Sequence, residues 1–280
     1  MSDLKVALVT GCSEGGIGYA FCEKLAARNY IVYATARRLE SMAPLTHPNF
    51  KKFVLDVTDD QQVQSVVATI ISIEGHIDMV INNAGILAPG PIIDYTDDQI
   101  KEVYDINVYS ILRVSRAVIP HMAGRKKGTI VNMGSVAGEF PTPWTGHYDA
   151  SKAAVRLMTE VLALECKPFN VKVMLVSAAS VRSQIIGKHD DYQLPQSSLY
   201  GGFLHNIRDR LEAARDKEAM QTSLFAEEVI SKADSASPPS YLLAGGKAGT
   251  YKLMAYLPRS WVLSIVWGMF SKPKAEEARQ

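Results

Sequence analysis

Short hydrophobic runs rich in β-branched residues recur along the chain, and longer segments of helical periodicity separate them. Each run is nearly continuous, without alternation of apolar and polar residues, which is typical of strands buried on both faces. Strands that alternate with helices form βαβ units with parallel strands. The pattern therefore predicts a doubly wound α/β fold with a parallel sheet of about seven strands and helices on both faces. The runs that we interpret as strands, the last of them the weakest, are Lys5–Thr10, Ile31–Ala36, Lys52–Asp56, Met79–Asn82, Thr129–Met133, Val171–Ser177 and Tyr241–Ala244.

The organisation of the chain favours one unit. Its 280 residues fit one large α/β domain or two small ones. No linker composition occurs before about residue 179 and no segment is repeated, so we expect a single domain over residues 1–280.

The segments 100–122 and 148–166 carry apolar side chains in nearly every direction around a helix. A sheet can cover only one side of such a helix. We therefore predict a homo-oligomer, a dimer or a tetramer, held through these two helices.

Composition argues against several classes of function. The formal net charge is +1 and no basic stripe with interleaved aromatic residues occurs, which argues against nucleic acid as a partner. The three cysteines form no C-x-x-C pair and the six histidines are scattered. We therefore expect no metal site, and a reducing, cytoplasmic compartment. Three residues precede the first apolar run, and no apolar stretch reaches about 18–20 residues, so we expect neither a signal peptide nor a membrane-spanning helix.

A glycine-rich loop, TGCSEGGIG at residues 10–18, directly follows the first expected strand and opens a helix. Glycines at this point permit a tight turn and let backbone N–H groups approach a pyrophosphate at the helix N-terminus. An ordinary glycine-rich turn could have the same composition. The order of strand, loop and helix nevertheless favours a dinucleotide-binding site.

The end of the second expected strand reads YATARRLE. In dinucleotide-binding folds an acidic residue at this point binds the ribose 2′-hydroxyl group of NAD, whereas a basic residue accommodates the 2′-phosphate of NADP. No carboxylate occupies the strand end, and Arg37 and Arg38 follow at once. Because a guanidinium group matches phosphate geometry, we predict NADPH/NADP rather than NADH as the cofactor. One of the two arginines could simply be solvated.

Four further motifs follow in order along the chain. They are NNAG at 82–85, DINVYS with Asn107 inside the expected helix Asp97–Met122, NMGSVAG at 132–138, and YDASK at 148–152. Together with the glycine loop, this series resembles the short-chain dehydrogenase/reductase family over roughly residues 4–185. The resemblance implies a Rossmann-type fold and an oxidoreductase that uses a nicotinamide cofactor.

A tyrosine and a lysine stand four positions apart in YDASK, one helical turn from each other. A free phenol has a pKa of about 10, which is too high for efficient proton transfer near neutrality. The ammonium group of Lys152 should lower the pKa of Tyr148, so we predict Tyr148 as the proton donor to a ketone oxygen. Ser135 would donate a hydrogen bond to the same oxygen. The resemblance implies that Lys152 also holds the nicotinamide ribose and that Asn107 organises a water molecule that connects Lys152 with solvent.

The resemblance also implies a set of cofactor-binding residues, and the chain departs from the family in two places. The glycine loop has one residue more than the common spacing, because Glu14 and Gly15 stand where one residue is usual. SAASVRSQI at 177–185 replaces a Pro-Gly pair and a threonine, and side chains in place of glycine leave the placement of the nicotinamide open. Besides Arg37, Arg38, Tyr148 and Lys152, the implied cofactor-binding residues are Gly11, Ser13, Gly16, Ile17, Gly18, Asp56, Asn83, Val181 and Ser183.

The C-terminal third of the chain is expected to hold the substrate. Loops that follow parallel strands build the substrate site, and we expect a lid over about 184–223 with a charged helix from about Asn206 to Met220. Residues 253–270 form an apolar tail, which either packs against protein or lies in a membrane interface. Side chains that could line the substrate pocket are Trp144, Tyr192, Leu194, Leu199, Tyr200 and Phe203.

Softer similarities extend the resemblance nearly from end to end. The stretches ATARRLE, ECKPFNVKV and AGTYKLMAYLPRSWVL are similar to those of fungal NADPH-dependent 1-acyldihydroxyacetone-phosphate reductases. That resemblance implies peripheral contact with endoplasmic reticulum or lipid droplets, whereas many relatives reduce ketones of secondary metabolites. We predict an NADPH-dependent reductase of an apolar or acyl-bearing ketone. The alternatives are a ketoreductase of fungal secondary metabolism, a dehydratase or epimerase, and a cofactor-sensing protein without turnover.

Overall fold

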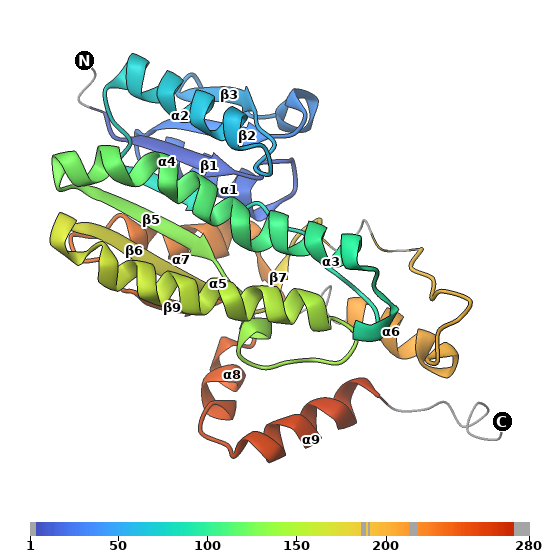
Figure 1. Ribbon diagram of the computed structural model, residues 1–280. Helices are drawn as coiled ribbons and strands as arrows, with labels where there is room; N and C mark the ends of the chain where they lie inside the picture. The colour runs from blue at the N-terminus through green and yellow to red at the C-terminus, as the bar shows by residue number, and fades with distance from the viewer. Residues whose placement is uncertain (1–3, 186–188, 190, 213–217, 272–280) are drawn as a thin grey trace.

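The protein was analysed as a computed structural model that describes residues 4–185, 189, 191–212 and 218–271. Its centre is a sheet of seven strands in the order β3-β2-β1-β4-β5-β6-β9 (Figure 1), and every neighbouring pair is parallel. This confirms the predicted fold class. The strands are β1 (Val6–Thr10), β2 (Ile31–Ala36), β3 (Phe50–Val54), β4 (Met79–Asn82), β5 (Gly128–Met133), β6 (Val171–Ala178) and β9 (Tyr241–Ala244).

Helices cover both faces of the sheet. Successive residues of a strand point to opposite faces, so an apolar strand needs a helix on each side to bury its side chains. On β1, Ala7 and Val9 belong to the core shared with α1 (Ile17–Ala26) and α7 (Thr222–Ala233). The intervening residues Val6 and Leu8 belong to the opposite core. Two buried faces explain why the strands lack alternation of apolar and polar residues. The helices of the second face are α2 (Asp60–Glu74), α4 (Ser110–Arg125) and α5 (Gly146–Glu165).

The observed elements differ from the expected ones at three points. Strand β3 begins and ends two residues earlier than predicted. It pairs only with β2, at the edge of the sheet, where a partly exposed strand needs no continuous apolar run. The expected helix Asp97–Met122 is divided into α3 (Asp97–Tyr104), a π-helical turn (Asp105–Tyr109) and α4.

The third difference lies in the expected lid. The charged helix expected from about Asn206 to Met220 corresponds to helix α6 (Leu204–Glu212). Met220 lies instead in the short strand β8 (Met220–Gln221). This strand pairs in parallel with β7 (Val181–Arg182). Of the remaining expected residues of the helix, 218 and 219 are not helical, and 213–217 lie outside the described residues. Short 3₁₀ helices complete the inventory at Leu39–Met42, Ile92–Asp94, Val136–Gly138, Lys167–Phe169 and Gly201–Phe203.

Two helices at the C-terminal end lie apart from the sheet layers. Helices α8 (Ala248–Met254) and α9 (Arg259–Phe270) stand below the sheet in Figure 1. Val262 and Val266 on α9 are buried against Val136 and Phe140, so the tail packs on the segment that follows β5. Within the described part of the chain, none of the helices combines the length and apolarity needed to cross a membrane.

Candidate active site

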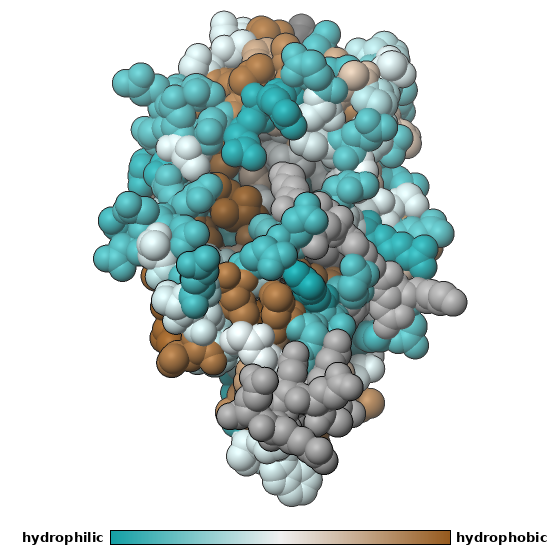
Figure 2. All heavy atoms as spheres, turned by 90° about the vertical axis from the view of Figure 1, so that its right-hand side faces the viewer, coloured by the Kyte–Doolittle hydropathy of each residue, from teal (hydrophilic) through white to brown (hydrophobic). Residues whose placement is uncertain are grey.

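One large cavity, of about 900 Å³, lies at the carboxyl ends of the strands. The segments that follow strands of a parallel sheet meet at one edge, and ligands bind there. On the face shown in Figure 2, hydrophobic side chains lie in the middle among hydrophilic ones. The lining includes residues that follow six strands in turn: Gly11, Arg37, Leu55, Asn83, Ser135 and Ala179.

The glycine loop connects β1 to α1 and forms one end of the cavity. Gly11 has a φ of 72°, which favours glycine. A Cβ atom on Gly18 would lie 2.4 Å from the carbonyl oxygen of Gly11, so the loop and the helix touch without room for a side chain. Gly16 is the N-cap of α1 and no side chain caps this helix end. The backbone N–H groups of the first helical turn are therefore available to bind an anion.

The extra residue of the glycine loop has a structural place. Gly15 has a φ of 71°, so the additional position is taken up by a second left-handed residue before the helix begins. The loop thereby keeps Gly16 at the N-cap and Gly18 against Gly11. Gly11, Gly16 and Gly18, which the resemblance implies as cofactor-binding residues, thus all lie where the loop meets the start of α1. Gly15 itself was not among the predicted site residues.

Asn83 joins the two strands between which the order of the sheet reverses. Its Nδ2 atom donates hydrogen bonds to the carbonyl oxygens of Thr10 and Gly11, each at 3.0 Å, and its backbone N–H group donates to Thr10 Oγ1. The side chain therefore holds the glycine loop to the end of β4. Asp56 lines the cavity after β3, where its Oδ1 atom accepts hydrogen bonds from the backbone and hydroxyl groups of Thr58.

The other predicted cofactor residues divide into two groups. Arg37 and Arg38 are both exposed at the end of β2, but Arg37 lines the cavity and Arg38 does not. Gly18 also stays outside the lining, since it packs inside the loop. The remaining members line the cavity; they are Ser13, Gly16, Ile17, Val181 and Ser183.

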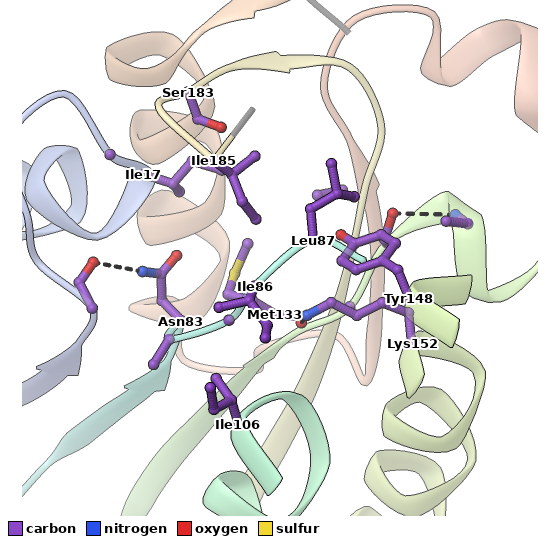
Figure 3. Close-up of a pocket in the computed structure, with 18 of the residues that line it drawn as sticks. Ile17, Asn83, Ile86, Leu87, Ile106, Met133, Tyr148, Lys152, Ser183 and Ile185 are labelled. Atoms are coloured by element: carbon purple, nitrogen blue, oxygen red, sulfur yellow. Dashed lines mark hydrogen bonds between the residues drawn. The ribbon is translucent and has the colours of Figure 1, made fainter. Parts of the chain in front are cut away.

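Tyr148 and Lys152 extend into the cavity from the start of α5, and Ser135 reaches it from the end of β5. Figure 3 shows the phenol and the lysine side chain next to each other, opposite Ile17 and Ser183. The Lys152 Nζ atom lies 5.7 Å from the centroid of the Tyr148 ring and donates a 2.8 Å hydrogen bond to the carbonyl oxygen of Met133. The structure thus places three of the four predicted catalytic side chains along one wall.

The pKa of Tyr148 differs from the sequence-based prediction. Burial raises the pKa of Tyr148 and outweighs the hydrogen bond with Ser135 and the charge of Arg210, both of which lower it. Burial also lowers the pKa of Lys152 to about 8. The prediction that Lys152 lowers the pKa of the phenol is therefore wrong for this structure, because withdrawal from water disfavours both the phenolate and the ammonium ion. The phenol stays protonated at neutral pH, which is the form that donates a proton.

Asn107 lies in the π-helical turn and does not line the cavity. It is fully buried; its side chain accepts a hydrogen bond from the backbone N–H of Ile86 at 2.8 Å and donates to the carbonyl oxygen of Ile86 and to Ser151 Oγ, each at 3.0 Å. A Cβ atom on Gly85 would lie 3.2 Å from Asn107 Oδ1 and 3.7 Å from Lys152 Nζ. Asn107 therefore ties the NNAG segment to α5, immediately behind Lys152. Its expected contact with a water molecule stays a prediction.

The unusual stretch 177–185 is held by the loop that follows β9. Ala179 N–H donates to Ala244, and Ser180 exchanges two backbone hydrogen bonds with Gly246, at 2.8 and 3.1 Å. Gly245 has a φ of 110°, and a Cβ atom there would lie 3.2 Å from the backbone nitrogen of Ala179. The stretch 177–185, which lacks the usual Pro-Gly pair, is thus held in place by Gly245 and Gly246 of the loop that follows β9. The glycine pair in the sequence AGGKAG, residues 244–249, carries the signal for this bracing.

The far end of the cavity consists of residues that the sequence did not indicate. They come from the segment after Ser135, from α6 and from the C-terminal helices. Those with the largest side chains are Phe140, Arg210, Leu211, Tyr251, Met269 and Phe270.

The aromatic residues predicted to line the substrate pocket lie elsewhere. Trp144 packs against Tyr200, Phe203 and Trp267, with ring centroids 5.7, 5.3 and 6.4 Å away, and its indole N–H donates to the carbonyl oxygen of Phe270 at 2.8 Å. These rings form a cluster outside the cavity lining that joins the lid to the tail. The other three predicted residues also lie outside that lining: Tyr192, which lines a smaller cavity of about 370 Å³, Leu194, and Leu199, which is 83% exposed.

Comparison with known proteins agrees with this geometry. The family model of the short chain dehydrogenases matches residues 5–193. This chain therefore belongs to the short-chain dehydrogenase family, and it is an oxidoreductase.

Similar proteins come from fungi and bacteria. The short-chain dehydrogenase virD of Hypocrea virens is 34% identical over 96% of this chain and 91% of its own length. The NADPH-dependent 1-acyldihydroxyacetone phosphate reductase of Saccharomyces cerevisiae is 32% identical over 92% of this chain and 88% of its own. Among solved structures, a short-chain dehydrogenase from Streptomyces avermitilis superposes with a TM-score of 0.81 at 29% identity, over 97% of this chain and 98% of that one.

Proposed function

We propose that this protein is an NADPH-dependent reductase that converts the ketone of an apolar or acyl-bearing molecule to an alcohol, with Tyr148 as the proton donor. The observation that carries the proposal is the meeting of Tyr148, Lys152 and Ser135 in the same cavity as the glycine loop. The Saccharomyces cerevisiae relative is named as an NADPH-dependent reductase, and its similarity over most of both chains supports the same cofactor here.

The nucleotide end of the cavity fits NADPH. The uncapped N-terminus of α1 offers N–H groups to a diphosphate, and Gly18 lets the helix pack directly against the loop at Gly11. Arg37 lines the cavity directly after β2, at the position where an acidic residue would favour NADH. NADPH, when bound, supplies the hydride. The side chains of this protein position the nicotinamide ribose and the ketone, and they donate the proton.

In the proposed mechanism the proton comes from a side chain that lines the cavity. The protonated phenol of Tyr148 donates to the ketone oxygen as negative charge develops there. The hydroxyl of Ser135, which interacts with Tyr148, donates a hydrogen bond to the same oxygen. The Nζ atom of Lys152 lies 5.7 Å from the centroid of the Tyr148 ring, and in this proposal its ammonium group holds the nicotinamide ribose beside the phenol. Asn107 fixes the segment that carries this arrangement.

The preference for NADPH rests mainly on Arg37 in this proposal. Arg37→Ala is expected to weaken NADPH binding by about 10- to 100-fold, since a charge-assisted hydrogen bond to phosphate contributes about 1.5–3 kcal/mol. Arg38→Ala should have a smaller effect, because Arg38 does not line the cavity. Fluorescence titration of both variants with NADPH and NADH measures this. Equal affinities of the two cofactors for the unmodified protein would contradict the prediction.

The reaction class can be tested with a panel of ketones. Loss of NADPH absorbance with acyl ketone phosphates and aromatic polyketide ketones would support a reductase and separate the two substrate classes. NADPH binding without turnover on any ketone would favour the cofactor-sensing alternative. Product formation without NADPH consumption would favour a dehydratase or an epimerase.

We also propose that residues 184–223 form the lid over the substrate and that residues 1–280 form a single domain.

We also propose that two copies of the chain associate through α5. Leu157, Val161 and Leu164 lie along one side of this helix and are 64%, 44% and 60% exposed, whereas the apolar residues of α4 are largely covered within one chain. Leu157→Glu combined with Leu164→Glu is expected to convert a dimer or tetramer to monomers, measured by sedimentation. Leu199→Glu, at an exposed loop position, is the matched control. A monomeric unmodified protein would overturn the proposal.

The outer side of α9 is the proposed contact with a lipid surface. Trp261 and Ile265, one turn apart, are 62% and 43% exposed, while Val262 and Val266 pack on the body and Trp267 contacts the ring of Trp144. Packing against the body therefore accounts for only part of the apolar tail, and an exposed tryptophan beside other exposed apolar side chains suits a membrane interface. Flotation with phospholipid vesicles tests this, since Trp261→Ser combined with Ile265→Ser should abolish co-flotation.

A further inference from the structure

Arg210 is a cationic side chain at the substrate end of the cavity. It lies near the end of α6, where the neighbouring residues Ile207 and Leu211 are buried and fix the helix against the body. Its Nε atom donates a 3.3 Å hydrogen bond to Thr142 Oγ1, and its guanidinium carbon lies 5.2 Å from the centroid of the Phe270 ring. Two segments distant in sequence therefore hold the guanidinium group at the cavity wall.

The terminal nitrogens of Arg210 are left open. Throughout the described residues, neither Nη atom has a hydrogen-bond partner and no carboxylate forms an ion pair with this side chain. Two lysines of the lining differ in this respect: Lys101 pairs with Asp98 and Lys247 pairs with Glu218, each at 3.0 Å. Arg210 thus lines the cavity with its Nε atom bonded to Thr142 and with both Nη atoms able to bind a further group.

Burial raises the pKa of the Asp149 carboxyl group, and the charge of Arg210 is close enough to oppose that rise, but Asp149 forms no ion pair with Arg210. Asp149 is buried, and its Oδ2 atom accepts hydrogen bonds from the backbone and hydroxyl groups of Thr142, at 2.7 and 3.3 Å. Thr142 therefore links Asp149 to Arg210 and positions the guanidinium group without covering its Nη atoms. The charge of Arg210 also lowers the pKa of Tyr148, which agrees with its position beside the reacting end of the cavity.

Apolar side chains surround this charge. Phe140, Tyr251 and Phe270 line the same end of the cavity, together with Leu211 and Met269. A neutral ketone would leave the guanidinium group in this wall without an anionic partner, which is costly in a partly dehydrated site. An oxyanion would bind to two Nη groups at once, because a guanidinium fork matches the geometry of phosphate and carboxylate.

We infer that Arg210 binds an oxyanion of the substrate, a phosphate or a carboxylate, so that the enzyme reduces amphiphiles with an apolar chain and a negative group near the ketone. This inference rests on the proposed function for its reaction, but the binding of the anion does not require turnover. Thr142 acts as a positioning residue for the guanidinium group.

Direct binding of unreactive probes tests the inference in the presence of NADPH. Octyl phosphate, octanoate and octanol share one apolar chain and differ only in the head group. Calorimetry on the unmodified protein should show one or both anions binding about 10- to 100-fold more tightly than octanol. Arg210→Gln should reduce anion binding to the level of octanol and leave octanol binding unchanged. The two anionic probes distinguish a phosphate site from a carboxylate site.

The matched control is Arg208→Gln, which removes an exposed arginine from the same helix. It should keep the preference for the anion. Arg210→Lys should keep part of it, because the charge stays while the planar fork is lost, and this partial rescue shows that the variants remain folded. Equal binding of all three probes by the unmodified protein would overturn the inference, as would an anion preference that survives in Arg210→Gln. Failure of the proposed function would instead appear as absence of ketone reduction, which these binding constants do not measure.

Discussion

Replacing Tyr148 with phenylalanine is expected to abolish ketone reduction while leaving NADPH binding nearly intact. The phenyl ring keeps the packing at the start of α5, and the change removes only the hydroxyl group that the structure places beside Ser135. General acid catalysis contributes about 10²- to 10⁴-fold in rate, so turnover should fall at least by that range. Steady-state kinetics with the best ketone of the panel and a fluorescence titration with NADPH measure the two effects separately.

A second tyrosine supplies the control for this experiment. Tyr200→Phe also removes a phenol hydroxyl, from the aromatic cluster around Trp144 and outside the cavity lining, and it should retain normal turnover. If Tyr148→Phe reduced ketones within a few-fold of the unmodified enzyme, Tyr148 would not be the acid. Loss of NADPH binding in the same variant would indicate that the change had damaged the site as a whole.

Replacing Lys152 with methionine is expected to abolish reduction and weaken NADPH binding, and at the same time to stabilise the protein without its cofactor. Burial lowers the pKa of Lys152 from an ordinary value of 10.5 to about 8, which corresponds to about 3 kcal/mol of destabilisation at neutral pH. Loss of the hydrogen bond to Met133 offsets roughly 1 kcal/mol of the stability gained by removing the buried charge. We therefore expect the free energy of unfolding to rise by about 2 kcal/mol at pH 7.

The pH dependence of this gain identifies its cause. A lysine whose pKa is lower in the folded state binds fewer protons there, so its destabilising effect is full below pH 8 and disappears as the pH rises to about 10.5. The difference between Lys152→Met and the unmodified protein should shrink across that window in urea unfolding. Lys172→Met, at an exposed lysine, should show no such trend. A destabilised Lys152→Met protein at pH 7 would contradict the argument.

The fold could be predicted because its signal is local and repeated. Five strands of the sheet, β1, β2, β4, β5 and β6, are nearly continuous apolar runs, and their burial on both faces produces that pattern directly. The π-helical turn Asp105–Tyr109 could not be predicted, because one extra residue in a turn barely disturbs helical periodicity over a long segment. The edge strand β3 was displaced by two residues, since its partly exposed residues carry little hydrophobic signal.

The site was predictable only where the residues belong to motifs. The glycine loop, Ser135, Tyr148 and Lys152 could be placed together from the order of the strands. Burial cannot be read from the spacing of a tyrosine and a lysine, and for this reason the direction of the pKa shift of Tyr148 was mistaken. The partners of Trp144 lie about 55 to 125 residues further along the chain, so nothing near it indicated that it packs on the tail.

The position of α9 has a consequence for how the enzyme is made. The nucleotide end of the cavity is built largely from residues between Gly11 and Asn83, whereas Met269 and Phe270 close the opposite end. Translation proceeds from the N-terminus, but a domain generally folds as a unit, and α1, which follows the phosphate loop, shares its core with α7. The nucleotide end can therefore be completed only after α7 has been made, whereas the substrate end also requires Phe270, whose carbonyl oxygen accepts the hydrogen bond from the indole of Trp144. Ribosome-bound intermediates should thus become competent for nucleotide only after α7 has emerged, and for substrate only after α9 has emerged.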